Sequence, residues 1–119
     1  MVQYEKDWLM RQVQMLVQFI ARVVFKLDVI SYEINEEQDS EINELYICLS
    51  ELLSANEICD AEDMLYDNFE GSKDYLRLAM WFYNEINLLT DEELEASNFS
   101  RDEVFEGLQS VLSKSGIPL

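Results

Sequence analysis

The sequence of 119 residues contains no histidine and is poor in glycine, proline and cysteine. Without histidine, the commonest acid–base residue and metal ligand is missing, and neither a Ser/His/Asp nor a Cys/His arrangement can form. The three glycines are far apart in the chain, which excludes a glycine-rich phosphate loop. The carboxylates stand in polar helical contexts that favour ionisation of both members of any pair. We therefore predict a protein that is not an enzyme and that carries no cofactor or metal ion.

The scarcity of glycine and proline also bears on the fold. Three glycines and one proline leave little material for the turns of a many-stranded β-protein, and they suit helices joined by short polar loops. A hydrophobic content of 49% excludes wholesale disorder. A chain of this length typically forms one domain. We therefore expect a single all-α domain over residues 1–119.

The two cysteines and the N-terminal segment contain no targeting or redox signal. Cys48 and Cys59 match no metal or redox spacing, and we expect them to be small buried side chains. Charged and polar residues interrupt the apolar stretch over residues 15–30, so it is neither a signal peptide nor a membrane span. These features predict a cytoplasmic protein without membrane contact.

Charge is divided unequally along the chain. Residues 1–26 contain four of the eight basic residues and two acids, whereas residues 27–119 contain 23 acids and four bases, a net charge of −19. The total charge of −17 disfavours direct binding to nucleic acid or to anionic membranes. It favours either a basic protein partner or simple solubility.

Residues 1–34 are predicted to form one long amphipathic helix. Eight apolar residues from Leu9 to Ile34 recur at alternating spacings of four and three. A second apolar row beside them contains Trp8, Met15 and Phe19. Together these rows cover roughly 220° of the helical wheel. Because one neighbouring helix cannot cover so wide an arc, we expect the helix to be either central in its own domain or shared with a second copy in a homodimer.

Residues 39–115 are predicted to form an acidic body of helical hairpins. Apolar residues at helical spacing indicate further helices that begin after Asp39 or Ser40, near Asn56, after Ser72, at about residue 91 and at about residue 101. Short connections favour antiparallel neighbours. The predicted fold is therefore all-α: a long N-terminal helix packed with antiparallel hairpins, in a repeat-like array of five to six helices.

A weak internal repeat accompanies these helices. The apolar pattern that starts at Ile42 recurs from Tyr75, as in the first helix of a tetratricopeptide-type hairpin. The glycine and proline signature of that repeat is missing. The match is explained equally well by kinship or by chance similarity between two amphipathic helices.

Three groups of residues are candidates for partner binding. The bases of the first helix could form a basic edge for an acidic partner, or they could pair with the acidic helices of the same chain. Trp8 and Trp81 could anchor a partner, since tryptophan is enriched at binding hot spots, or they could be ordinary core residues. A row of carboxylates on the third helix could bind a basic partner. The candidate partner-binding residues are Trp8, Trp81, Arg11, Arg22, Lys26, Asp60, Asp63, Asp67 and Glu70.

Three stretches of the chain resemble a known family. They are the opening YEKDWLMRQ over residues 4–12, the segment AEDML over residues 61–65, and LEASNFSRDEVFEG over residues 94–107. Together they resemble a family of small uncharacterised helical proteins of Gram-positive bacteria. The resemblance implies an all-helical cytoplasmic protein with repeat-like hairpins after an N-terminal helix, and it implies no activity or catalytic residue.

Three functions are therefore open. The first is a protein-interaction module or adaptor that uses a helical surface. The second is an acidic mimic of nucleic acid, which would inhibit a nucleic-acid-binding protein or nuclease. The third is a stable helical domain whose acidity serves only solubility. We rank the interaction module first and the mimic second.

Overall fold

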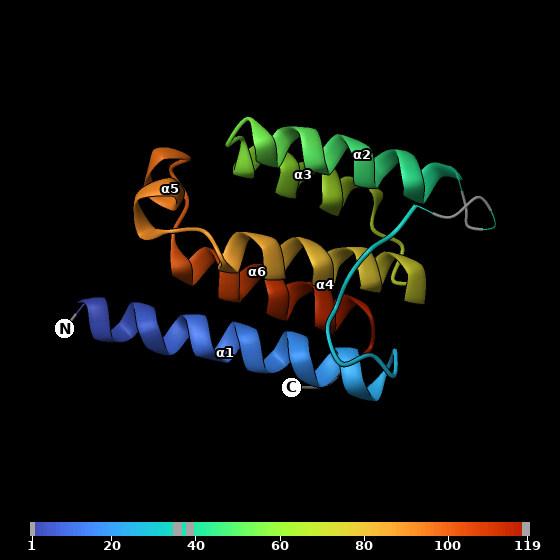
Figure 1. Ribbon diagram of the computed structural model, residues 1–119, viewed down its shortest axis with the longest axis horizontal. Helices are drawn as coiled ribbons and strands as arrows, with labels where there is room; N and C mark the ends of the chain where they lie inside the picture. Colours follow the sequence, from blue (N-terminus) through green and yellow to red (C-terminus); the bar gives the residue numbers. More distant parts are fainter. Residues whose placement is uncertain (1, 35–36, 38–39, 118–119) are drawn as a thin grey trace.

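The computed structural model of the chain, shown in Figure 1, describes residues 2–34, 37 and 40–117. These residues contain six helices and no strand, which confirms the all-α prediction. The helices are α1 (Val2–Val23), α2 (Ser40–Ser54), α3 (Ile58–Asn68), α4 (Lys73–Asn87), α5 (Asp91–Ala96) and α6 (Arg101–Lys114).

The helices are arranged in three layers. In Figure 1, α2 and α3 lie above α4 and α6, α1 lies below them, and the short α5 closes one end. Contacts between the elements agree with this order, because α1 packs on α4 and α6, whereas α2 packs on α3 and α4. Consecutive long helices run in opposite directions, as the short connections predict.

The central helix is α4 and not α1. Ten of its fifteen residues are buried, since α1, α2 and α6 all pack against it. By contrast, α1 buries one face only, through Leu9, Val13, Val17, Ile20 and Ala21. The expectation that the first helix is central in its own domain is therefore wrong.

The first helix is also shorter than predicted. It ends at Val23, and residues 24–34 leave the helix axis, so the predicted helix over residues 1–34 is wrong in its last third. Lys26 adopts a left-handed conformation (φ +57°), and the Leu27 N–H donates to the Ala21 carbonyl at 2.9 Å. From this turn the chain crosses the layer of α4 and α6 toward the layer of α2 and α3 (Figure 1).

Burial beyond the turn explains why the helix stops. Ile30 and Tyr32 are each only 6% exposed. The Tyr32 ring stacks on Tyr46 at 4.7 Å between centroids, and its hydroxyl donates to Asn43 Oδ1 at 2.9 Å. A helix that continued straight along its axis would carry these side chains away from the body and into solvent. Core packing therefore overrides the local helical periodicity.

Local capping signals predict the starts of three of the other helices. Ser72, Thr90 and Ser100 each accept from a backbone N–H in the first turn of α4, α5 and α6. Asn56 is different: it ends α2 in a left-handed conformation (φ +59°) and does not cap α3. Asp39, one of the two residues expected to cap α2, lies outside the described residues.

No helix in the described part of the chain is long and apolar enough to cross a membrane.

Cys48 and Cys59 are both free and exposed, so the expectation that they are buried is wrong.

Candidate partner-binding site

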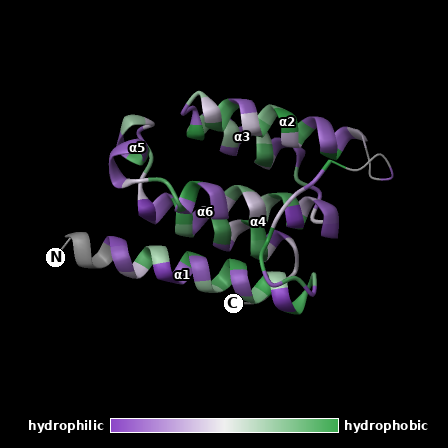
Figure 2. Cartoon of the chain, in the orientation of Figure 1, coloured by the Kyte–Doolittle hydropathy of each residue, from purple (hydrophilic) through white to green (hydrophobic). Residues whose placement is uncertain are grey.

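The outer side of α1 carries a row of exposed apolar side chains. Trp8, Met15, Phe19 and Val23 are 46%, 61%, 56% and 51% exposed. At about 100° per residue they fall within an arc of about 80°, roughly opposite the face that packs on α4 and α6. We call these four residues the α1 stripe. Figure 2 shows that hydrophobic residues recur along the length of α1. The stripe is the part of the predicted apolar arc that the described elements leave about half exposed.

The two tryptophans occupy different environments. Trp8 leans on Phe105 of α6 in an edge-to-face contact, with 6.1 Å between ring centroids, and keeps nearly half of its surface exposed. Trp81 is only 9% exposed and lies against Tyr46, with 4.8 Å between ring centroids. Trp81 is therefore a core residue, which corrects its expected place on a binding surface. Trp8 remains a candidate anchor.

The bases of α1 lie beside the stripe. Arg11 and Arg22 are exposed and follow one edge of the stripe, within about 40° of Met15 on the helical wheel. Lys26 is exposed at the turn after α1. Among the side chains that the structure describes, none of these three bases has a carboxylate within ion-pair distance. The described side chains therefore do not show the alternative in which these bases pair with the acidic helices of the same chain.

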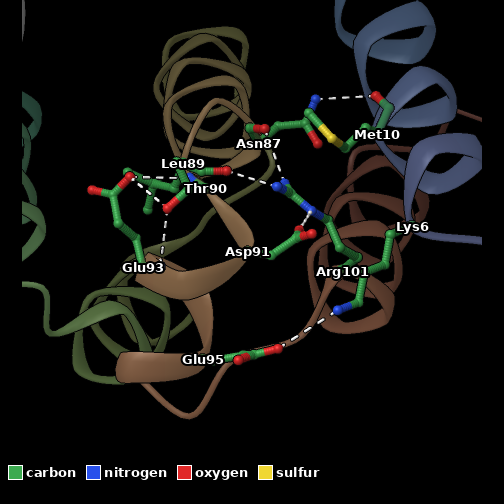
Figure 3. A network of polar contacts seen from close by, with 9 residues as sticks. All are labelled: Lys6, Met10, Asn87, Leu89, Thr90, Asp91, Glu93, Glu95 and Arg101. Carbon is green, nitrogen blue, oxygen red and sulfur yellow. Dashed lines mark hydrogen bonds and ion pairs between the residues drawn. The ribbon is translucent and has the colours of Figure 1, made fainter. Parts of the chain in front are cut away.

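A buried arginine holds the surroundings of α1 in place (Figure 3). Arg101 is 5% exposed, and its guanidinium donates to the carbonyls of Asn87 and Leu89 at 3.0 and 2.6 Å and to Asp91 Oδ1 at 3.0 Å. These carbonyls lie at the end of α4, where helical partners run out. The Asn87 amide in turn donates to the Met10 carbonyl at 3.1 Å. The network joins α4, α5 and α6 and connects them to α1.

The acidic candidates lie on another part of the molecule. Asp60, Asp63 and Asp67 are exposed on α3, and Glu70 is exposed just after that helix ends. They belong to the layer of α2 and α3, which the layer of α4 and α6 separates from α1. The predicted site residues thus form two separate surfaces, one basic and apolar on α1 and one acidic on α3.

One carboxylate differs from the ionised, exposed ones that the sequence predicts. Glu62 of α3 accepts a hydrogen bond from the Tyr83 hydroxyl at 2.8 Å, and the Tyr66 hydroxyl donates to the Gly107 carbonyl at 3.2 Å. Gly107 permits this approach, because a Cβ there would lie 2.5 Å from the Tyr83 hydroxyl. Burial raises the pKa of the Glu62 carboxyl, the Tyr83 hydrogen bond lowers it, and Glu103 raises it further, with a net upward shift.

We expect Glu62→Gln to flatten the fall in stability with rising pH. The folded chain keeps the Glu62 proton to a higher pH than the unfolded chain does. The associated stability is present below the unfolded pKa and is lost as pH rises through the folded pKa. Glutamine still accepts from Tyr83 but has no proton to lose. The measurement is the free energy of unfolding in urea between about pH 4 and pH 8.

The exposed Glu85→Gln is the matched control for this experiment. The dependence of its unfolding free energy on pH should keep the wild-type shape, since Glu85 lacks the buried surroundings of Glu62. If the Glu62→Gln profile also keeps that shape, the buried carboxyl does not govern this pH dependence.

Several residues of these sites were not among the predicted ones. Met15 and Phe19 belong to the predicted second apolar row, and the width of the arc is a signal that they need cover. Arg101 and Tyr83 carried no comparable signal, because their partners are distant in sequence. Within the described ranges, no three or more histidine, cysteine or carboxylate side chains are arranged to hold a metal ion.

Comparison with known proteins places the chain in a family. Residues 3–116 match a family of unknown function (DUF6483), and the chain belongs to this family. No curated protein and no solved structure matches the chain. The match covers nearly the whole chain, and the family assigns no activity.

Proposed function

We propose that this protein is a non-enzymatic interaction module or adaptor that binds another protein through the α1 stripe. The observation that carries the proposal is the concentration of exposed apolar side chains on one helix. Of the eight large hydrophobic residues exposed in the described chain, four belong to the stripe. Contiguous exposed apolar surface rimmed by polar residues is typical of interaction sites.

The helical hairpins provide a rigid support for this surface. The offset in sequence between the starts of α2 and α4 equals the offset between the starts of α3 and α5. This equal displacement supports a repeat-like array with hairpins of the tetratricopeptide type, an architecture that presents helical faces to partners. We further propose a cytoplasmic location, because the two exposed cysteines are free, a state that a reducing compartment preserves.

A comparison of stripe and control variants in the native cells tests the proposal. Met15→Ser with Phe19→Ser removes two exposed apolar side chains and leaves the core unchanged. Leu88→Ser removes another exposed apolar side chain, which is 70% exposed and lies outside the stripe, so it serves as the control. We expect the proteins captured by the wild type to be lost with the stripe variant and retained with Leu88→Ser, as quantitative mass spectrometry would show. Equal capture by all three forms would refute the proposal.

The acidic surface supports a second candidate function, that of a nucleic-acid mimic. The helices α2 and α3 contain no lysine or arginine, and Asp60, Asp63 and Asp67 are exposed on α3 at helical spacing. Neighbouring carboxylates at this spacing are about 5–6 Å apart, which suits the basic groove of a nucleic-acid-binding protein. Such a complex should weaken steeply with salt, whereas apolar binding by the stripe should change little. Partner affinity at low and high salt distinguishes the two functions.

A further inference from the structure

We infer that the occupant of the α1 stripe is an amphipathic helix of another protein, with an apolar face and acidic residues along the edge that meets Arg11 and Arg22. This inference rests on the proposed function and adds the chemistry of the partner. It is carried by the geometry of the stripe and by the bases beside it, which have no carboxylate partner among the described side chains.

The shape of the stripe selects a helical partner. Its residues run from Trp8 to Val23 along α1, a distance of about 22 Å at the usual helical rise. The backbone N–H and C=O groups of a helix interior are already paired, so α1 offers no main-chain partners to an added β-strand. A helix of about four turns matches the length of the stripe and packs on it through side chains alone.

The charges beside the stripe select an acidic edge on that partner. Arg11 and Arg22 are separated by three helical turns, which places them about 16 Å apart along the same edge of the stripe. Both are exposed, and neither has a carboxylate partner among the described side chains. Carboxylates at the same separation on a partner helix would meet both guanidiniums. An arginine can hold a carboxylate by two parallel hydrogen bonds.

The acidity of the body does not cancel this basic edge. The acidic helices α2 and α3 lie beyond the layer of α4 and α6, and packed helices are about 8–10 Å apart. The distance across two such layers exceeds the Debye length of about 8 Å at about 0.15 M ionic strength. The charge of α2 and α3 is therefore largely screened at the stripe.

A second copy of the chain fits the stripe less well. Twofold-related α1 helices that run antiparallel would place Arg11 and Arg22 of both copies on the same side of the contact. Asp7, the acidic side chain described on α1, lies outside the stripe, one helical turn before Arg11, and like charges across a contact suppress pairing. The basic edge therefore disfavours an antiparallel homodimer through the N-terminal helix and favours an acidic partner.

Synthetic peptides test the partner chemistry with the full chain. The probes are three labelled helical peptides of about 18 residues, long enough to form a helix, with the same leucine face and with glutamate, glutamine or lysine edges. Binding is measured by fluorescence anisotropy at about 0.15 M salt. We expect the glutamate peptide to bind about fivefold tighter than the glutamine peptide, since two exposed ion pairs each contribute modestly.

Variants separate this inference from the proposed function. Arg11→Gln with Arg22→Gln should abolish the preference for glutamate and retain binding of the glutamine peptide, whereas Met15→Ser with Phe19→Ser should abolish binding of both.

A wild-type chain that binds the glutamine peptide at least as tightly as the glutamate peptide overturns the acidic partner and leaves the interaction module standing. The acidic partner is also overturned if the wild-type chain binds the lysine peptide more tightly than the glutamate peptide and the Met15→Ser with Phe19→Ser variant loses this binding. Dimerisation in light scattering that the stripe variant abolishes would identify a second copy as the occupant. If neither the glutamate nor the glutamine peptide binds, the stripe itself fails as a binding site.

Discussion

Arg101→Met is expected to lower the free energy of unfolding by about 2–4 kcal/mol, because removal of the buried guanidinium leaves two main-chain carbonyls without their donor. Methionine fills a similar volume but donates no hydrogen bond. The substitution leaves the carbonyls of Asn87 and Leu89 and the carboxylate of Asp91 without the guanidinium that they share. Chemical denaturation, with the slope of the transition checked for two-state behaviour, measures the loss.

Lys6→Met is the control for this variant. Lys6 pairs with Glu95 at 3.5 Å near the same corner, but Glu95 is 70% exposed, so the pair should contribute less than about 1 kcal/mol. A loss of similar size in the two variants would contradict the view that the buried guanidinium holds α4, α5 and α6 together.

Trp81→Ala is expected to destabilise the fold by about 3–5 kcal/mol, the range for removing a large aromatic side chain from a core. Trp81 is 9% exposed and packs against Tyr46, so truncation leaves a cavity between α2 and α4. Partner binding at the stripe should survive under conditions where the variant is folded, because Trp81 lies in the core and not on the stripe. Thermal or chemical unfolding measures the first effect, and the peptide assay measures the second.

Trp8→Ala is expected to affect partner binding more than stability. Trp8 is 46% exposed and touches Phe105 by one edge, so its removal should cost clearly less stability than the removal of Trp81 and should weaken binding at the stripe. If Trp8→Ala were the more destabilising substitution, the assignment of the two tryptophans to surface and core would be wrong.

Features set by local sequence were predictable. Ser72 and the Thr90–Glu93 pair cap their helices as expected, because a capping side chain bonds to backbone only a few residues away. The end of α1 was not predictable in this way. Periodicity continues to Ile34, but the burial of Ile30 and Tyr32 against the body outweighs the helical preference.

The candidate site was predictable only where it depends on local sequence. The width of the apolar arc on α1 indicated that one neighbour would not cover it, and the structure leaves its outer part, with Met15 and Phe19, exposed. The sequence could not distinguish Trp8 from Trp81, because burial depends on which helix occupies the centre. That choice depends on contacts among α1, α2, α4 and α6, which no single segment specifies.

The division of charge along the chain is also a division in space. The bases of residues 1–26 lie on α1 or at its end, and the layer of α2 and α3 contains no base at all. Separation by the layer of α4 and α6 allows one small molecule to carry an apolar surface with a basic edge and an acidic surface without mutual neutralisation. This arrangement explains why Arg11 and Arg22 have no carboxylate partner among the described side chains.

Oxidative footprinting inside the native cells tests the central claim most directly. Met15 is 61% exposed in the isolated chain, so hydroxyl radicals should oxidise it readily in dilute purified protein. In the cell we expect Met15 and Phe19 to be protected and Leu88, outside the stripe, to react as in the purified protein. Oxidation of Met15 to the same extent in the cell and in dilute solution would contradict the claim that α1 binds a partner.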